Sequence, residues 1–431
     1  MIVGTNRTAP INQGTPSGFT IHRHYPNASQ PALPTNREYH GAARLSEAYV
    51  DEGRRWGVPS EAFINQAAMG WGRVPVWREG AKGEQLMAVV MGGRPGGVSG
   101  VPGGDHMRIS IGQFNEATHE KMVFAKQLGC AGVLLNTPRL PGEHRWEYED
   151  LVRLREYVES YGLRLEALEN TPKHFYEGAM LGTSERDRQI EHYQATIRNV
   201  GRAGIPILGY HWMPSSVWRS QGTPLQIGRG GARVTAFDMA LHADSPNTHG
   251  RVYSADEMWA NYEYFIKAVI PVAEEAGIKL ALHPDDPPVP MLGGVARIFS
   301  SFEGFKRGSE VIESDAWGMD FCMGCWSEMG GHDNVMRGIE HFVPLGKILY
   351  CHCRDVVGPA DRFAECFLGE GQMRLFEIFM AFKKHGFTGF LIDDHVPHMI
   401  DDSEWGHRGR AHATGYMLAT LDAVEAACQC E

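Results

Sequence analysis

The strongest constraint on this chain is an alternation that starts near Met107, where short apolar and β-branched runs alternate with longer amphipathic segments. This pattern predicts parallel strands joined by helical crossovers. Eight runs fit strands, and eight is the number that closes a barrel of this kind. The expected strands are RISIGQF (108–114), GVLLN (132–136), RLEALEN (164–170), PILGYHW (206–212), IKLALHP (278–284), WGMDFC (317–322), KILYCHC (347–353) and GFLIDDH (389–395).

Helical segments are expected between these strands, and several end in the Gly-containing turns that lead from a helix into a strand. They are 117–128, 146–161, 185–203, 255–276, 335–343, 375–384 and 411–427. The main alternative is an open doubly wound sheet, but no Gly-x-Gly-x-x-Gly turn follows the first strand. The sequence therefore predicts an α/β fold of the (β/α)8 TIM-barrel class.

The first 105 residues differ in composition from the rest of the chain. Pro, Gly, Asn and Thr are frequent near the start, a helical stretch is expected near 44–56, and the segment ends in GGRPGGVSGVPGG. We expect residues 1–105 to form an N-terminal extension and Gly-rich connector that wraps the barrel or a neighbouring subunit. Residues 106–431 are expected to form the catalytic barrel.

The connection after the fourth strand, 214–254, is long and polar. On a barrel of this class, a loop at this place covers the mouth at the carboxyl ends of the strands. A segment of this length predicts a lid that closes over a substrate.

Charge and composition narrow the functional classes. The chain has 41 Lys and Arg against 52 Asp and Glu, a net charge of −11, which argues against a nucleic-acid partner and favours a small-molecule substrate. The first residues lack the basic and apolar regions of a signal peptide, and no run of 18 apolar residues occurs. We therefore expect a cytoplasmic protein without a membrane partner. Eight cysteines are too few for a disulfide scaffold, so we expect them reduced.

Residues with metal-binding side chains occur at the ends of the last four expected strands. These are His283, Cys322, His352 and Asp394. Because the carboxyl ends of the strands of a parallel barrel open on one mouth, we expect the four side chains to converge there. Two imidazoles, a thiolate and a carboxylate suit Mn, Fe, Co or Zn better than Mg or Ca.

A rival interpretation is a structural zinc site made of Cys322, Cys325, Cys351 and Cys353. Strand alternation argues against it, because Cys351 and Cys353 flank His352 and should point to the opposite face. We also expect a functional turn directly after His283, where Asp285 and Asp286 lie among three prolines. Either aspartate is a candidate for supporting the metal site or binding a substrate hydroxyl.

The segments LALHPDDPP, DFCMG, YCHCRD and DDHVPHMIDD, with GYHWMP and ENTPKH upstream, resemble the mannonate dehydratases over roughly residues 107–425. In that family a His-Pro-Asp-Asp-Pro-Pro turn, a Cys-Thr-Gly-Ser turn, a His-Leu-Arg turn and an Asp-His-Gly turn recur in this order. The resemblance implies Mn2+ or Fe2+ bound by His283, Cys322, His352 and Asp394. It also implies a homo-oligomer.

What the resemblance implies chemically is removal of water from a sugar acid, D-mannonate giving 2-keto-3-deoxygluconate. His395, which directly follows Asp394, matches the family's catalytic histidine. Arg354 is expected to pair with the substrate carboxylate as a planar bidentate donor. Tyr210 and His211 are expected near the same mouth as catalytic or substrate-contacting groups, with His211 a second candidate acid or base. His174 is ranked with Asp285 and Asp286 as a substrate contact.

Two other functions remain open at this point. A sugar isomerase or epimerase of the xylose-isomerase-like barrels would share the metal and the mouth, but it would need two bases or a hydride path. A barrel with a purely structural metal would be no enzyme. The turns also differ from the family pattern, since Cys-Thr-Gly-Ser reads Cys322-Met-Gly-Cys325 here and His-Leu-Arg reads His352-Cys-Arg354.

Overall fold

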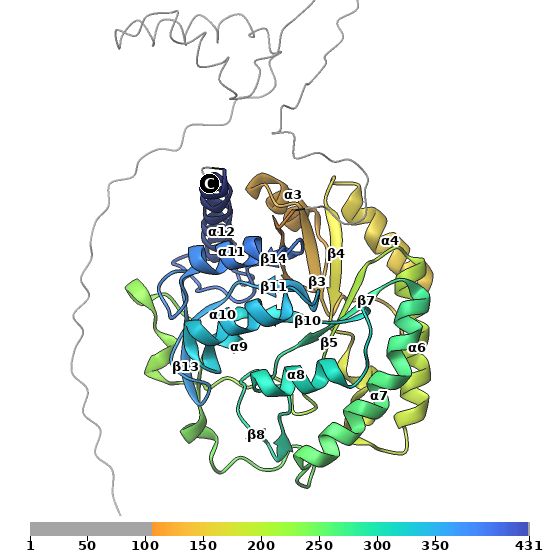
Figure 1. Cartoon of the computed structure of the whole chain (residues 1–431). Coiled ribbons are helices and arrows are strands. Elements are labelled where there is room, and N and C mark those ends of the chain that lie inside the picture. Colours follow the sequence, from red (N-terminus) through yellow and green to blue (C-terminus); the bar gives the residue numbers. More distant parts are fainter. Residues whose placement is uncertain (1–105, 430–431) are drawn as a thin grey trace, which may run out of the picture. The chain divides into compact units, whose positions relative to one another are not determined.

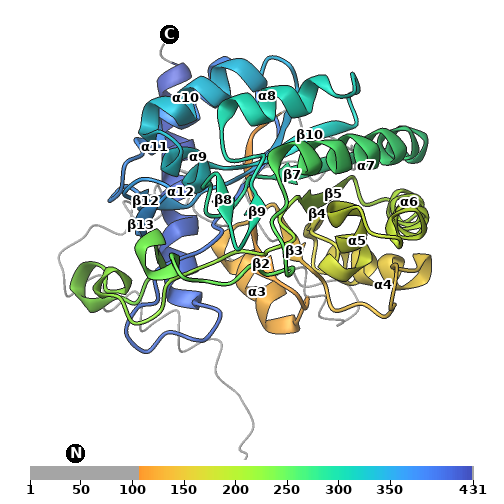
Figure 2. The same ribbon diagram turned by 90° about the horizontal axis from the view of Figure 1, so that it is seen from below.

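The computed structural model describes residues 106–429, and their strands build a closed parallel barrel (Figures 1 and 2). The main sheet has the order β1-β14-β11-β10-β7-β5-β4-β3-β2. β1 (Arg108–Ile109) and β2 (Ile111–Phe114) are the two halves of the first predicted strand. Since β1 pairs with β14 and β2 pairs with β3, both in parallel, the ring closes with eight strand positions. The predicted (β/α)8 barrel is confirmed, and the open sheet is wrong.

The other strands match the remaining seven predicted runs closely. They are β3 (Gly132–Asn136), β4 (Arg164–Glu169), β5 (Ile207–His211), β7 (Lys279–His283), β10 (Trp317–Cys322), β11 (Ile348–His352) and β14 (Phe390–Ile392). The runs could be recognised because strands of a parallel barrel are covered on both faces and are therefore almost continuously apolar.

Helices surround the barrel on its outer face (Figure 2). The seven predicted helices correspond to α3 (His119–Leu128), α4 (Tyr148–Glu159), α6 (Arg186–Arg202), α7 (Ala255–Ala276), α10 (Gly331–Phe342), α11 (Leu375–Lys384) and α12 (His407–Cys428). Three further helices were not predicted: α5 (Glu177–Leu181), α8 (Phe302–Glu310) and α9 (Met323–Glu328). α7 begins with a capping box between Ser254 and Glu257, which is a strong local start signal.

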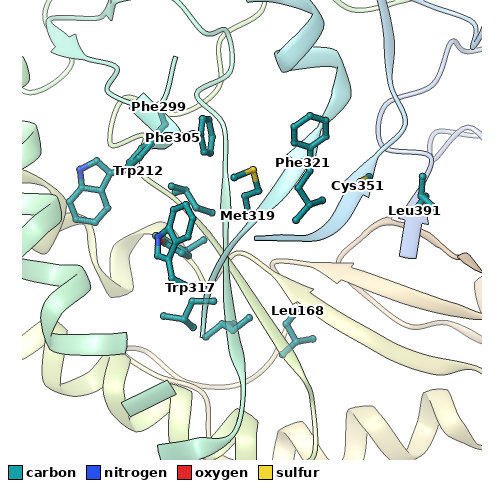
Figure 3. Packing of buried hydrophobic residues seen from close by; sticks show 14 of the residues in the cluster. Leu168, Trp212, Phe299, Phe305, Trp317, Met319, Phe321, Cys351 and Leu391 are labelled. Atoms are coloured by element: carbon teal, nitrogen blue, oxygen red, sulfur yellow. The ribbon is translucent and has the colours of Figure 1, made fainter. Parts of the chain in front are cut away.

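Two apolar layers follow the alternation of side chains along the strands. Trp317, Met319, Phe321, Cys351 and Leu391 belong to the large cluster that packs between the strands and the helices (Figure 3). A smaller cluster contains residues that alternate with these, so we assign it to the barrel interior. Its members include Leu134, Ala167, Ala281, Tyr350, Phe390 and Ile392.

The long connection after β5 pairs with the connection after β11 in a second sheet, which we call the mouth sheet. It consists of β12 (Asp355–Val357), β13 (Arg362–Cys366) and β6 (Ala236–Asp238), all paired antiparallel. A small apolar cluster lies beneath it, with Phe237, Val289, Leu292, Val356 and Phe363. A hairpin of β8 (Met291–Leu292) and β9 (Val295–Ala296) follows β7.

The predictions for residues 1–105 lie outside the described residues. Within 106–429, no helix is long and apolar enough to cross a bilayer. The seven cysteines that the described part contains are all free thiols.

Candidate active site

The barrel brings the four predicted metal ligands together. His283, Cys322 and His352 are the last residues of β7, β10 and β11, and Asp394 lies two residues after β14. One ligand atom from each of His283, Cys322 and His352 lies within 4.8 Å of the others. Asp394 Oδ2 lies 3.6 Å from His352 Nδ1 and 3.8 Å from Cys322 Sγ. All four side chains are buried.

These separations fit a shared ion. Bonds of about 2.0–2.3 Å to nitrogen, oxygen and sulfur place neighbouring ligand atoms about 3.0–3.6 Å apart, depending on the geometry. His352 Nδ1 is buried and has no hydrogen-bond partner among the described residues, so it presents a free lone pair or proton to this centre. His283 contacts the Pro284 carbonyl through Nδ1 at 2.6 Å, which leaves Nε2 for an ion. The donor set therefore fits a divalent metal.

Two carboxylates fix the other nitrogen of His352. Nε2 lies 2.7 Å from Glu169 Oε2 and 3.1 Å from Asp320 Oδ2. Glu169 is in turn held by Asn136 Nδ2, which donates at 2.9 Å. Such partners set the tautomer and the ring orientation of a metal-binding histidine and raise its basicity.

The electrostatic environment favours an anionic sulfur and cationic surroundings. Burial acts to raise the pKa of Cys322, but the adjacent Cys325 thiol, the charge of Arg354 and the two neighbouring imidazoles bring it well below its usual value. Burial acts to lower the pKa of His352, but Asp320, Glu169 and Asp394 hold it well above its usual value. The centre thus has an excess of negative charge that protonated imidazoles neutralise and that a divalent ion would neutralise better.

Asp394 is held in an unusual backbone conformation by the last helix. Its φ is +48°, a left-handed conformation that a residue with a side chain adopts at some cost. Arg410 of α12 donates from Nη1 to the Asp394 carbonyl at 2.9 Å and to Asp393 Oδ2 at 2.8 Å. Arg410 and Asp393 are both buried, so this pair fixes the direction in which Asp394 points.

Arg354 is part of the wall of the site. Its side chain is 1% exposed, and it lies 2.8 Å from Glu365 and 3.2 Å from Glu328. Its Nη2 also contacts Cys322 Sγ at 3.5 Å. A Cβ at Gly324 would lie only 2.5 Å from Arg354 Nε, so the close approach requires glycine there. Arg354 is already engaged by the protein's own acids, which does not favour the predicted pairing with a substrate carboxylate.

His395 lies beside the ligand cluster and points toward the mouth sheet. Its side chain is 38% exposed, and Nδ1 lies 2.9 Å from Glu365 Oε1. Nε2 lies 3.7 Å from Asp394 Oδ1. Burial acts to lower the pKa of His395, but Asp394 and Glu365 raise it above its usual value. His395 is thus a partly exposed titratable group in direct contact with the cluster.

His211 and Tyr210 face opposite sides of β5, as strand alternation requires. His211 pairs in register with His283 on the neighbouring strand. Burial and the charge of His283 lower the pKa of His211 to about 3, so its ring is neutral near pH 7. Tyr210 is fully buried, and its hydroxyl lies 3.1 Å from the Tyr262 hydroxyl of α7. The structure does not place Tyr210 at the mouth, as the sequence predicted, because its side chain packs in the helix layer.

The predicted substrate contacts are distributed over three environments. His174 is exposed on a short 3₁₀ turn, Lys173–Phe175, and contacts the Glu143 carbonyl at 3.0 Å. Asp285 is buried, accepts from the Phe299 backbone at 2.7 Å and lies 3.7 Å from Arg297. Asp286 forms a bidentate pair with Arg219, with distances of 2.7 and 2.8 Å. Both aspartates are thus held by the protein itself.

Several residues of the site were not predicted. Three side chains meet at Oε1 of Glu365, on β13. This oxygen lies 3.0 Å from Arg219, 2.8 Å from Arg354 and 2.9 Å from His395. Glu169 and Asp320 could have been predicted from the sequence. Glu169 is the last residue of a barrel strand, and Asp320 lies two residues before Cys322, on the same face of the strand. The sequence contains no comparable signal for Glu365 and Arg219, because they lie in the connections after β11 and β5 rather than on barrel strands.

The rival zinc site made of four cysteines is not formed. Cys351 and Cys353 belong to the outer apolar cluster, where Figure 3 shows Cys351 between Phe321 and Leu391. Within residues 106–429, the groups whose ligand atoms are close enough to share an ion do not include either of them. Burial raises the pKa of both thiols well above the usual value.

The closed (β/α)8 barrel and the buried nitrogen, sulfur and oxygen donors at its mouth place this chain among the metal-dependent barrel enzymes. The sequence profile of the D-mannonate dehydratase (UxuA) family matches residues 107–250 and 247–431, and the chain belongs to that family of hydro-lyases.

Individual relatives agree with this assignment. A mannonate dehydratase of Streptococcus pneumoniae is 34% identical over 260 residues, covering 55% of this chain and 70% of the relative. Mannonate dehydratase 2 of Halalkalibacterium halodurans is 30% identical over 330 residues, covering 70% of this chain and 93% of the relative.

Solved structures extend the comparison. The crystal structure of mannonate dehydratase from Streptococcus suis serotype 2 superposes with a TM-score of 0.67 at 29% identity, covering 76% of this chain and 95% of that one. A D-tagatose 3-epimerase-like protein superposes with a TM-score of 0.50 at 15% identity, covering 75% of this chain and 100% of that one, which shows a shared fold alone.

Proposed function

We propose that this chain is a metal-dependent dehydratase that removes water from a sugar acid such as D-mannonate and gives the corresponding 2-keto-3-deoxy acid. The observation that carries the proposal is the convergence of His283, Cys322, His352 and Asp394, with His352 Nδ1 buried and without a hydrogen-bond partner among the described residues. Membership of the mannonate dehydratase family names the reaction class. The four residues are therefore proposed as the metal ligands.

The proposed metal is Mn2+ or Fe2+. Two imidazoles and a thiolate suit a borderline ion, and the carboxylate of Asp394 suits one that also accepts oxygen ligands. When bound, such an ion withdraws charge from a chelated carboxylate and makes the neighbouring C–H bond more acidic.

His395 is the proposed proton-transfer residue. Glu365 holds its Nδ1 at 2.9 Å, so Nε2 is the nitrogen that remains for the substrate. The neighbouring anions keep this imidazole protonated to higher pH than usual, which suits a general acid that protonates the departing hydroxyl.

The remaining polar groups are proposed to bind and position. His211 is neutral near pH 7, so it serves as a hydrogen-bonding contact for the substrate better than as a general base. Arg354, Asp285 and Asp286 shape the wall through their ion pairs. His174 is kept as a substrate contact at the rim, where its ring would have to turn away from the Glu143 carbonyl.

The proposal is tested by loading the metal-free protein with Mn2+ or Fe2+ and incubating it with a panel of aldonates that includes D-mannonate. We expect a 2-keto-3-deoxy acid to accumulate only with metal. His395→Ala should retain the metal and lose turnover. If the panel yields only isomerised or epimerised sugars, dehydration is the wrong reaction.

A further inference from the structure

Cys325 lies directly against the proposed metal ligand Cys322, and the mechanism above has no use for it. Arg354 Nη2 lies 3.5 Å from Cys322 Sγ and 3.0 Å from Cys325 Sγ, so one guanidinium touches both sulfurs. Both side chains are fully buried. Two sulfurs on one guanidinium are close neighbours, which is the arrangement in which one thiol attacks the other once that one has been oxidised.

The local backbone places the two cysteines three residues apart at the start of one helix. Cys322 is the N-cap of α9, and Cys325 is the third residue of that helix. Side chains three residues apart at the start of a helix lie on one face, with Cβ atoms about 5–6 Å apart. A disulfide needs Cβ atoms about 3.5–4.5 Å apart, so forming the bond requires side-chain rotation and a shift of about 1–2 Å in the first turn of α9. The spacing Cys-x-x-Cys is also the one used by dithiol redox sites.

We propose that Cys322 and Cys325 form a reversible redox pair, which peroxide converts to a disulfide when the metal is absent. The proposal rests on Cys322 being a metal ligand, as proposed above. A sulfur committed to a disulfide is no longer a thiolate donor, so oxidation removes one ligand of four.

The chemistry balances with hydrogen peroxide as the oxidant. The Cys322 thiolate attacks one peroxide oxygen, so that an S–O bond forms, the O–O bond breaks, and water leaves after protonation. Cys325 then attacks the sulfenic sulfur, so that the S–S bond forms, the S–O bond breaks, and a second water leaves. Two thiols are oxidised and one peroxide is reduced to two waters.

The first arm of the test maps the bond. Metal-free protein is treated with hydrogen peroxide, the remaining thiols are alkylated, and the peptides are analysed by mass spectrometry. We expect a peptide in which Cys322 and Cys325 are joined, and dithiothreitol should restore both thiols. Protein loaded with Co2+ beforehand should be protected. Wild-type protein in which Cys322 reaches sulfinic acid while Cys325 stays alkylatable would overturn the proposal.

The second arm measures Co2+ binding by the thiolate-to-cobalt absorption band. Oxidised wild-type protein should bind Co2+ more than about 10-fold more weakly than reduced protein, since one ligand is lost. Cys325→Ser should bind Co2+ normally when reduced and form no disulfide. Cys428→Ser, which changes a half-buried cysteine at the end of α12, should behave like wild type. A Co2+ affinity that does not change when the disulfide forms would also overturn the proposal.

The two proposals can fail separately. If reduced protein gives no thiolate-to-cobalt band, Cys322 is no ligand and the proposed metal site fails. If the band appears but peroxide yields no Cys322–Cys325 bond, only the redox pair fails.

Discussion

Glu169 Oε2 lies 2.7 Å from Nε2 of His352, while Nδ1 of the same ring has no hydrogen-bond partner within the described part of the chain. The carboxylate on β4 thus directs the ring on β11 toward the ligand cluster. Glu169→Gln removes the charge that raises the basicity of His352, so we expect Mn2+ affinity to fall roughly 10–100-fold. Mn2+ titration followed by electron paramagnetic resonance measures this, with the exposed Glu159→Gln on α4 as control. Equal affinities would contradict the role of Glu169.

Binding of the ion should stabilise the fold, because buried anions gather at the centre. At a Mn2+ concentration 100-fold above Kd, the free energy of unfolding should rise by about 2.7 kcal/mol, since the ion binds only the folded chain. Thermal unfolding with and without Mn2+ measures this rise. Asp394→Asn should reduce this Mn2+-dependent stabilisation. Equal stabilisation of the variant and the wild type would show that Asp394 does not contribute to binding the ion.

Substitutions of His395 and Tyr210 are predicted to differ in their effect on kcat. His395→Ala should lower kcat by roughly 10²–10⁴-fold while metal affinity is retained, because the proton donor is removed. Tyr210→Phe removes only a hydroxyl pair with Tyr262, so it should cost about 1 kcal/mol of stability and leave kcat nearly unchanged. A large drop of kcat in Tyr210→Phe at full metal occupancy would return Tyr210 to the catalytic residues.

Arg410 is predicted to support Asp394 from the last helix. Arg410→Gln leaves Asp393 buried without its cation, which should cost about 3–5 kcal/mol of stability. Because Asp394 then loses the donor to its carbonyl, Mn2+ affinity should fall as well. Urea unfolding and Mn2+ titration measure the two effects. Arg408→Gln changes an exposed residue of the same helix and should alter neither.

Glu328 should make stability depend on pH. Burial raises its pKa to about 8, although Arg354 opposes the rise. A carboxyl whose folded-state pKa lies above its unfolded value contributes stability that is complete below about pH 4.5 and is lost as pH rises through about 8. Glu328→Gln removes this loss, so its stability relative to wild type should increase between pH 5 and 9. A difference that stays constant over this range would show that Glu328 does not titrate there.

The barrel and the convergence of the proposed ligands could be predicted because both depend on local patterns. A strand covered on both faces is a continuous apolar run, and His283, Cys322 and His352 each interrupt such a run at its last residue. The same reasoning misplaced Tyr210, since being near a strand end does not decide the face, whereas its alternation with His211 does. Glu365 and Arg219 were missed because the mouth sheet joins segments more than a hundred residues apart, and strands of three to five residues leave little pattern.

The pairing of β6 with β13 has a consequence for altering what this enzyme accepts. Arg219 enters from the excursion after β5, and Glu365 from the one after β11, yet they meet at 3.0 Å. Replacing only one of these two connections with that of a homologue would leave one charge of the pair without its partner. It would also interrupt the hydrogen bonds between β6 and β13. Chimaeras that aim at a new sugar acid should therefore exchange both segments as a unit.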